Sequence, residues 1–299
     1  MKIFNEDCFK VFPTLEDESI DMILCDLPYG TSACKWDTVL NFEHLWQEYI
    51  RLIKPSGAVV LFGNEPFSSH LRLSCPLPLT YKYDWKWVKN KGSNFLNAKF
   101  QPFKLNEDIM VFSKMASAHS KKGSMNYFPI MEKGAPYKNT WCPNRKGGIS
   151  AVVASNFHPK ENFAPKTVTE RLPGNILYFD KPTNGFHPTE KPVPLLEYLI
   201  KTYTHEGDTV LDNCMGSGST GVACLNTNRN FIGIELNKDY YGTARKDLIA
   251  DKDVELFKRV LEDMGIPLKE GSGCITINGI PALEWLDTHE LFPDFRGKS

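Results

Sequence analysis

An aspartate and an aromatic ring follow a short apolar run near the start of the chain. In the segment 23–30, ILCDLPYG, Asp26 comes at the end of an expected buried strand, where α/β sheets keep their sites. Its carboxylate accepts hydrogen bonds, and Pro28 favours an extended Leu27 whose carbonyl can point the same way. Tyr29 offers a flat face for a base extruded from a duplex. The segment could therefore bind one amino group of a base. The alternative is a strand that ends in an Asp turn, with Tyr29 in the core.

A glycine-rich segment later in the chain is typical of a nucleoside site. Residues 210–221, VLDNCMGSGSTG, run from an expected strand through glycines into a helix, whose first amides can face a ligand. Such a loop alone could be a plain tight turn. Glu235 ends the next expected strand roughly 20 residues on, where a carboxylate can bind ribose hydroxyls. The two features together indicate a nucleoside site.

Two runs of elements must position these residues. Short β-branched strands alternate with helical patterns before residue 113, which predicts βα units and a mainly parallel sheet. The expected strands there are 2–5, 20–25, 58–62, 81–88 and 108–112, with a helix over 41–54. The pattern returns at about residue 187, and the expected elements are a helix after Pro194, a strand at 209–212, a helix from 219, a strand at 230–235, a helix through 240–248, and a last helix from 251 to about 264.

Charge separates the middle of the chain from the rest. The 35 basic and 36 acidic residues nearly cancel, so the whole chain gives no hint of a polyanionic partner. Residues 114–181 contain eleven basic and four acidic residues, a net charge of +7, which leaves −8 elsewhere. This segment is rich in Gly, Pro, Asn and Ser and predicts little regular structure. It is the natural place for phosphate contacts, although an ordinary solvated insertion would look similar.

Other classes of protein are disfavoured by what the sequence lacks. Its eight cysteines are scattered, without C-x-x-C pairs or Cys/His clusters, so we expect reduced thiols and no metal. The start, MKIFNEDC, is acidic where a signal peptide is apolar, and no apolar run reaches the roughly 18 residues of a membrane span. We therefore expect a cytoplasmic protein that does not enter a membrane.

Three motifs resemble those of one enzyme family. Residues 26–29, DLPY, resemble the D-P-P-Y motif of amino-group DNA methyltransferases, and residues 212–218 resemble their cofactor loop. Residues 187–192, HPTEKP, resemble the H-P-T-x-K-P element that precedes this loop in the β-class order. The resemblance covers residues 1–113 and 185–250. It implies a Rossmann-like, S-adenosylmethionine-dependent methyltransferase sheet with a circularly permuted motif order.

The same resemblance divides the chain. Residues 1–113 would be the catalytic half of the core and residues 185–250 the cofactor-binding half. Residues 114–184 would be an inserted, basic target-recognition region that binds double-stranded DNA. There, Arg145 and Lys146, beside Trp141 and two glycines, are our preferred groove-contacting residues. Residues 251–299 would form a C-terminal extension to which the sequence assigns no role.

Roles in the site follow by similarity. The catalytic residues would be Asp26, Leu27, Pro28 and Tyr29, with Asp26 and the Leu27 carbonyl accepting hydrogen bonds from the target amino group. The cofactor would be lined by Asp212, Gly216 and Gly218 at its methionine part, Glu235 at its ribose and Lys191 at its carboxylate. Asp7 and Cys8 match the place of its adenine, although Asp7 could simply cap a turn. The departures are Leu27 for the usual proline, Asn213-Cys214 for Pro-Phe, and Ser219 for Thr.

Several alternative functions are compatible with parts of this pattern, and the main one differs in the target base. Asp at position 26 goes mostly with N6 of adenine in this family, whereas Ser would be expected for N4 of cytosine, the main alternative. A glutamine methyltransferase would have N-P-P-Y and its cofactor loop first, and an inactive DNA-binding subunit would not need Asp26, Tyr29 and Lys191. The resemblance places the protein in bacteria or phages, in the setting of restriction-modification. The oligomeric state stays open, with a homodimer as one option.

Overall fold

The structure is a computed structural model that describes residues 1–30, 38–93, 98–118, 123–139, 166–181, 190–246, 248, 269–271, 274–277 and 280–281. The chain divides into two compact units, residues 1–244 and 245–299. Each is described by itself. None of the described helices is both long and apolar enough to cross a membrane.

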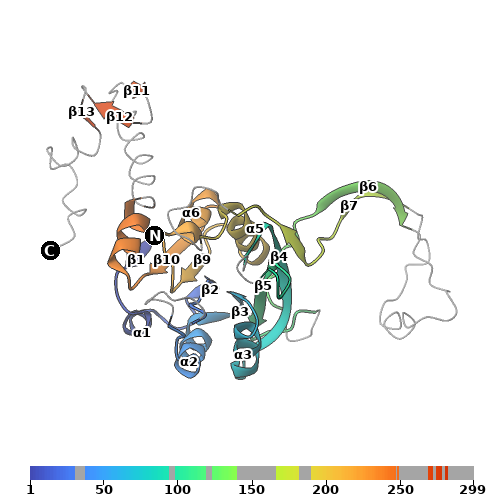
Figure 1. The fold of residues 1–299 in the computed structure, drawn as a ribbon, viewed down its shortest axis with the longest axis horizontal. Coiled ribbons are helices and arrows are strands. Elements are labelled where there is room, and N and C mark those ends of the chain that lie inside the picture. Colours follow the sequence, from blue (N-terminus) through green and yellow to red (C-terminus); the bar gives the residue numbers. More distant parts are fainter. Residues whose placement is uncertain are drawn as a thin grey trace. The chain divides into compact units, whose positions relative to one another are not determined.

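The first unit is built on an eight-stranded mixed sheet with the order β1-β10-β9-β2-β3-β5-β4-β8 (Figure 1). Its strands are β1 (Lys2–Phe4), β2 (Ile20–Cys25), β3 (Ile53–Gly63), β4 (Thr80–Ser93), β5 (Lys104–Ser113), β8 (Ile176–Tyr178), β9 (Thr209–Asp212) and β10 (Asn230–Ile234). The five strands from β1 to β3 are parallel, β5 is antiparallel to both neighbours, and β8 pairs parallel with β4. The predicted α/β class is therefore confirmed.

Strands β2 and β9 are neighbours although they lie far apart in sequence. Met22 pairs with Val210, and Ile23 pairs with Leu211. From β2 the chain moves to β3 on one side, whereas from β9 it moves to β10 on the other. This reversal is a topological switch point, and the carboxyl ends of the strands beside it are where open α/β sheets bind ligands. Both predicted motifs follow these two strands.

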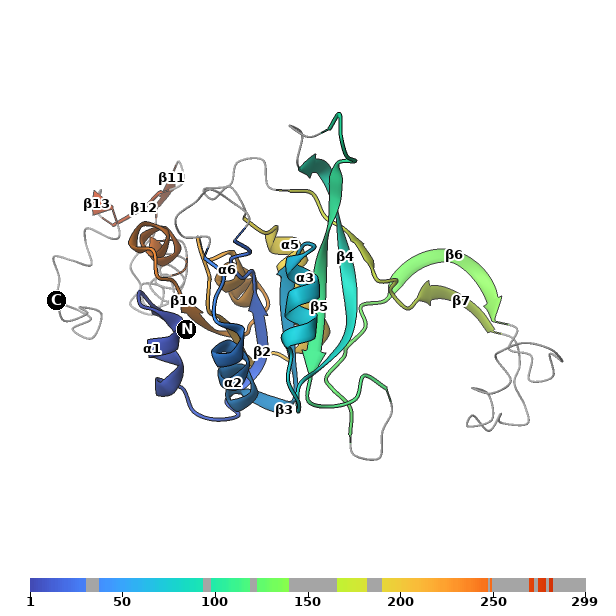
Figure 2. The same cartoon turned by 60° about the horizontal axis from the view of Figure 1, so that its bottom comes forward.

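Helices cover both faces of the sheet (Figures 1 and 2). The helices on one face are α1 (Cys8–Val11), α2 (Phe42–Leu52) and α3 (Phe67–Ser74); those on the other are α5 (Val193–Tyr203) and α6 (Ser219–Asn226). On the first face, the Trp46 ring of α2 lies 5.1 Å from that of Phe112. On the second, Trp85 Nε1 donates to the Tyr203 hydroxyl at 2.6 Å. The core thus has three layers.

Helix α2, which connects β2 to β3, shows how the sequence determines where an element begins and ends. Asn41 caps its start by accepting the His44 amide at 3.0 Å. Its buried side chains, spaced three and four residues apart, face the sheet. The helix ends at Leu52 because Ile53 is already extended and begins β3. Strand β3 is therefore longer than the predicted 58–62 and includes Gly57, where a Cβ would lie 2.7 Å from the Asp21 carbonyl oxygen.

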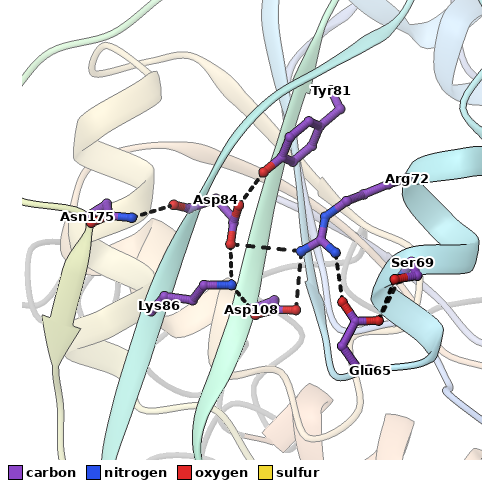
Figure 3. Close-up of polar contacts among 8 residues, drawn as sticks. All are labelled: Glu65, Ser69, Arg72, Tyr81, Asp84, Lys86, Asp108 and Asn175. Atoms are coloured by element: carbon purple, nitrogen blue, oxygen red, sulfur yellow. Dashed lines mark hydrogen bonds and ion pairs between the residues drawn. The ribbon is translucent and has the colours of Figure 1, made fainter.

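Alternation along β5 sends adjacent carboxylates to opposite faces. Asp108 faces α3, where it accepts from Lys86 at 2.6 Å and from Arg72 at 3.2 Å, and Arg72 also binds Glu65 at 3.0 Å (Figure 3). This ion-pair network ties α3 to β4 and β5. Glu107 faces the other side, toward the residues that precede α5.

The other described strands form two smaller sheets. Within residues 114–184, β6 (Glu132–Asn139) and β7 (Lys166–Arg171) form an antiparallel ribbon, while β8 belongs to the main sheet. In the second unit, β11 (Lys269–Gly271), β12 (Cys274–Ile277) and β13 (Ile280–Pro281) form an antiparallel sheet. The expected helix at 251–264 lies outside the described residues.

Candidate active site

Asp26 directly follows β2, and both of its carboxylate oxygens have partners. Oδ1 accepts a hydrogen bond from the Tyr29 hydroxyl at 2.6 Å, and Oδ2 contacts the ammonium group of Lys191. The Tyr29 ring packs at 4.8 Å from that of Phe67. Burial, followed by the charge of Asp26, raises the pKa of Tyr29 well above its ordinary value. Tyr29 is therefore a neutral donor toward Asp26. The buried Leu27 and the partly exposed Pro28 continue the chain between them.

Lys191 lies just before α5 and is only 8% exposed. Besides Asp26, its ammonium lies 3.5 Å from Glu107 Oε2 and 5.0 Å from the centre of the Phe62 ring. Burial disfavours the charged amine, but the two carboxylates outweigh burial and raise the pKa of Lys191 above its ordinary value. In this structure Lys191 is thus a charged partner of Asp26 in the DLPY motif. Its expected contact with a cofactor carboxylate stays a prediction.

Glu107 completes this cluster and was not singled out from the sequence. It is 8% exposed and lies between two ammonium groups, those of Lys89 on β4 and Lys191. Burial raises its pKa, but the two lysines outweigh burial and leave the value lowered, so the carboxylate is ionised. One sequence signal was available, since alternation places Lys89 and Glu107 on the face that carries the buried Trp85 and Trp87.

The glycine loop follows β9 and needs its glycines. Gly216 has φ +54° and Gly218 has φ +91°, a region that side chains with a Cβ rarely adopt. Gly218 is the N-cap of α6, and its amide donates to the Met215 carbonyl at 2.9 Å. A Cβ built on Gly216 would have no atom within 4 Å. The loop backbone is therefore open to a ligand on this side.

Asp212 ends β9 and is almost fully buried beneath the loop. It accepts the Thr220 hydroxyl at 2.6 Å and the Cys214 amide at 3.1 Å. Burial raises its pKa to about 6 despite these hydrogen bonds. No cationic side chain among the described residues lies within ion-pair distance of it. Such a carboxylate fits a ligand that brings its own positive charge.

Glu235 follows β10 and anchors the glycine loop. Its Oε2 accepts the Gly216 amide at 2.9 Å, and its Oε1 accepts the Asn237 amide at 2.7 Å. Burial raises the pKa of this carboxyl. Each oxygen keeps a second lone pair for another donor. Glu235 can therefore shape the loop and bind a hydroxyl at the same time.

Asp7 and Cys8 lie where β1 leads into α1. Asp7 is the N-cap of this helix and accepts the Phe9 amide at 2.9 Å, while Cys8 is buried and its pKa is raised to about 12. Asn213, one of the departures from the family pattern, is buried and accepts the Tyr49 hydroxyl at 2.6 Å. The departure at Asn213 is thus matched by a hydroxyl partner in the core.

Some predicted residues cannot be placed. Arg145, Lys146 and residues 187–189 of the HPTEKP element lie outside the described residues. No group of three or more His, Cys, Asp and Glu side chains in the described part could hold a metal ion.

A Rossmann-like sheet with an acceptor, an aromatic ring and a nucleoside loop at one switch point is the arrangement of a nucleoside-dependent methyltransferase. Residues 20–246 match the sequence model of the N6/N4 DNA methylases, and the chain belongs to this family of amino DNA methyltransferases. The β-class resemblance is thereby confirmed. S-adenosylmethionine is the methyl donor of this family.

Individual relatives agree with this placement. The YubD methylase of Escherichia coli K12 is 49% identical over 257 residues, which cover 83% of this chain and 90% of that protein. The type II methyltransferase M.HpaI of Haemophilus parainfluenzae is 28% identical over 283 residues, covering 89% of this chain and 82% of that protein. A solved complex of M1.HpyAVI with S-adenosylmethionine has a TM-score of 0.53 at 25% identity and covers 83% of this chain and 99% of that one.

Proposed function

We propose that this DNA methyltransferase modifies the N6 amino group of an adenine that is flipped out of duplex DNA at one short sequence. The observation that carries the proposal is an aspartate, Asp26, at the carboxyl end of β2 beside the switch point. The family pairs Asp at this position mostly with adenine and Ser with cytosine.

The chain's own residues would polarise the target. The amino nitrogen of a base shares its lone pair with the ring and is a poor nucleophile. Hydrogen bonds from its two protons to Asp26 and the Leu27 carbonyl would localise that lone pair for attack, and the Tyr29 ring would hold the base plane. Positioning and polarisation suffice because S-adenosylmethionine supplies a methyl group already activated on a sulfonium.

The described residues fit that cofactor. Asp212 is a buried carboxylate with a raised pKa and no cationic partner, which suits the cofactor's ammonium group. The open backbone at Gly216 and the left-handed Gly218 beside it suit its methionine part, and Glu235 suits a ribose hydroxyl. Lys191 would meet its carboxylate. Asp7 and Cys8 would border its adenine.

Duplex DNA would be held by residues 114–184. Their positive charge supports phosphate contacts, and Arg145 and Lys146 are the proposed groove contacts. We further propose that the protein is bacterial or phage-encoded and acts in the cytoplasm in restriction-modification, with the homodimer as one form to be measured.

Product analysis tests the target atom. DNA from a host that expresses the protein is digested to nucleosides and compared by mass spectrometry with DNA from a host that expresses Asp26→Ala. We expect N6-methyladenine from the wild type only. N4-methylcytosine without N6-methyladenine would contradict the choice of base, and no methylated amino group at all would contradict the activity.

A further inference from the structure

The proposed acceptor of the target base is already engaged when no DNA is present. Tyr29 donates to Asp26 Oδ1, and the Lys191 ammonium contacts Oδ2. Lys191 is the stronger competitor because it is charged, while the incoming amino group of a base is neutral. For the base to bind Oδ2 in a direct hydrogen bond, Lys191 must move from that oxygen to another acceptor.

Glu107 offers that acceptor. Its Oε2 is buried, lies 3.5 Å from the Lys191 ammonium and has no hydrogen bond in this structure. A buried carboxylate oxygen without a donor is costly, so a donor that comes within reach is strongly favoured. A movement of well under an ångström would bring the ammonium to a normal hydrogen-bond distance of about 2.8 Å.

Lys89 fixes the other end of Glu107. Its ammonium contacts Oε1, and its side chain is as buried as that of Lys191. The charges thus alternate from Lys89 through Glu107 and Lys191 to Asp26. Because Lys89 holds Oε1, the Glu107 carboxylate stays ionised and keeps Oε2 directed at Lys191. The Lys191 ammonium therefore has two competing carboxylates, of which only Asp26 belongs to the catalytic motif.

We propose that Glu107 is a positioning residue that draws the Lys191 ammonium away from Asp26, so that Asp26 can accept the target amino group. This inference rests on the proposed function of Asp26 as the acceptor for the base. Glu107 itself touches neither base nor cofactor in it. Without its charge, Lys191 would stay on Asp26 in the cofactor-free protein, and the base would have to displace an ammonium that has no other protein carboxylate within reach.

The chain provides a matched control in the next residue. Asp108 has the same side-chain exposure as Glu107, 10%, and it also binds two cationic side chains. It points to the opposite face of the sheet, into the ion-pair network of Figure 3, and has no contact with Lys191. Glu107→Gln and Asp108→Asn therefore remove one buried charge each from the same strand, and only the first variant affects the Asp26 cluster.

The experiment measures base capture without turnover. Without cofactor, wild type, Glu107→Gln and Asp108→Asn are titrated onto a duplex in which 2-aminopurine replaces the base next to the target adenine, and the fluorescence gain is recorded as the adenine leaves the stack. Folding is checked by thermal unfolding, and total DNA affinity by anisotropy. We expect Glu107→Gln to lose roughly tenfold in the flipping equilibrium, equivalent to about 1.4 kcal/mol. We expect Asp108→Asn to flip the base as the wild type does.

A second background shows whether Glu107 acts through Lys191. In Lys191→Met, Asp26 has no ammonium competitor, so adding Glu107→Gln should change the fluorescence gain less than twofold. An equal loss in both backgrounds would overturn the inference, as would a loss in Glu107→Gln no larger than in Asp108→Asn. If the wild type and Glu107→Gln flip the base equally well, this inference is overturned while the proposed function stands. A wild type that flips no base would contradict the proposed function as well.

Discussion

The amide of Gly216 donates a 2.9 Å hydrogen bond to the carboxylate of Glu235, which follows the neighbouring strand. This contact joins the two segments that the proposed cofactor must touch. It helps to hold the glycine loop, in which Gly216 and Gly218 have positive φ angles and the N-cap Gly218 has no side-chain hydrogen bond. Cofactor affinity should therefore depend on Glu235 through loop shape as well as through direct contact.

Glu235→Ala should weaken S-adenosylmethionine binding by at least tenfold, since hydrogen bonds to charged groups contribute about 1.5–3 kcal/mol each. Titration calorimetry measures the affinity. The matched control is Asp208→Ala, which removes a carboxylate that accepts the His205 amide at 2.7 Å at the other end of β9. If both variants lose the same affinity, Glu235 has no specific role at the cofactor.

Cofactor affinity should fall in acid because of Asp212. Its pKa is raised to about 6, so below that pH the carboxyl is protonated and cannot attract an ammonium group. We expect roughly a tenfold loss of affinity for each pH unit below 6, measured by calorimetry from pH 5 to pH 7.5. Asp212→Asn should bind weakly with no such dependence. A wild-type affinity that is flat across this range would contradict the role given to Asp212.

The same carboxyl should cost stability at neutral pH. The folded protein keeps the Asp212 proton up to about pH 6, whereas the unfolded chain loses it near the ordinary value of 3.8. Its contribution to the unfolding free energy therefore falls as the pH rises through this window. Without cofactor, Asp212→Asn should unfold at a higher temperature than the wild type at pH 7 and gain less at pH 4. Thermal unfolding followed by circular dichroism measures both, and a variant that is less stable at pH 7 would refute this.

Asp26→Ala should lower the methylation rate at saturating cofactor by roughly 10²–10³-fold or more, because it removes a preorganised electrostatic contact to the reacting group. Cofactor affinity should stay within a few-fold of wild type. Incorporation of labelled methyl groups into DNA measures the rate. A variant with an unchanged rate would remove Asp26 from the mechanism.

Arg145 and Lys146 should contribute to the salt dependence of DNA binding. Replacing both with Gln should reduce the slope of log affinity against log salt by about 2, since each phosphate contact contributes about 0.9. A control that changes the net charge equally is Lys10→Gln with Lys201→Gln, two exposed lysines paired with Glu one turn away. Equal slopes for the two double variants would reject this loop as a phosphate contact.

The sequence predicted the positions of strands better than it predicted the short helix α3 or the order of the strands in the sheet. Residues 20–25 form β2 as predicted, because a fully buried apolar run followed by Asp and Pro leaves little else. Helix α3 was missed, since its eight residues include three serines and a His and give only a short apolar stripe. The strand order could not be predicted, because the pairing of β2 with β9 depends on contacts between residues 188 positions apart.

The site was predicted as motifs rather than as contacts. Asp26 and Lys191 were each singled out, but their ion pair joins segments 165 residues apart and leaves no mark in either motif. Glu107 was missed because the expected strand began at residue 108 and the one before it ended at 88, which excluded both Glu107 and Lys89 from their strands. The roles at the cofactor stay predictions.

The strand pairings also define how the protein could be taken apart. The first strand, β1, pairs with β10, and β2 pairs with β9. The adjacent strands β10 and β9, from the second half of the core, therefore lie between β1 and β2, from the first half, and are hydrogen-bonded to both. Suppose that the chain were expressed as two polypeptides divided within residues 182–189. Each polypeptide would then hold only some strands of the sheet, and the strands with which they pair would be on the other polypeptide. Methylation by such a split enzyme would report the meeting of the two fragments as a covalent mark in DNA.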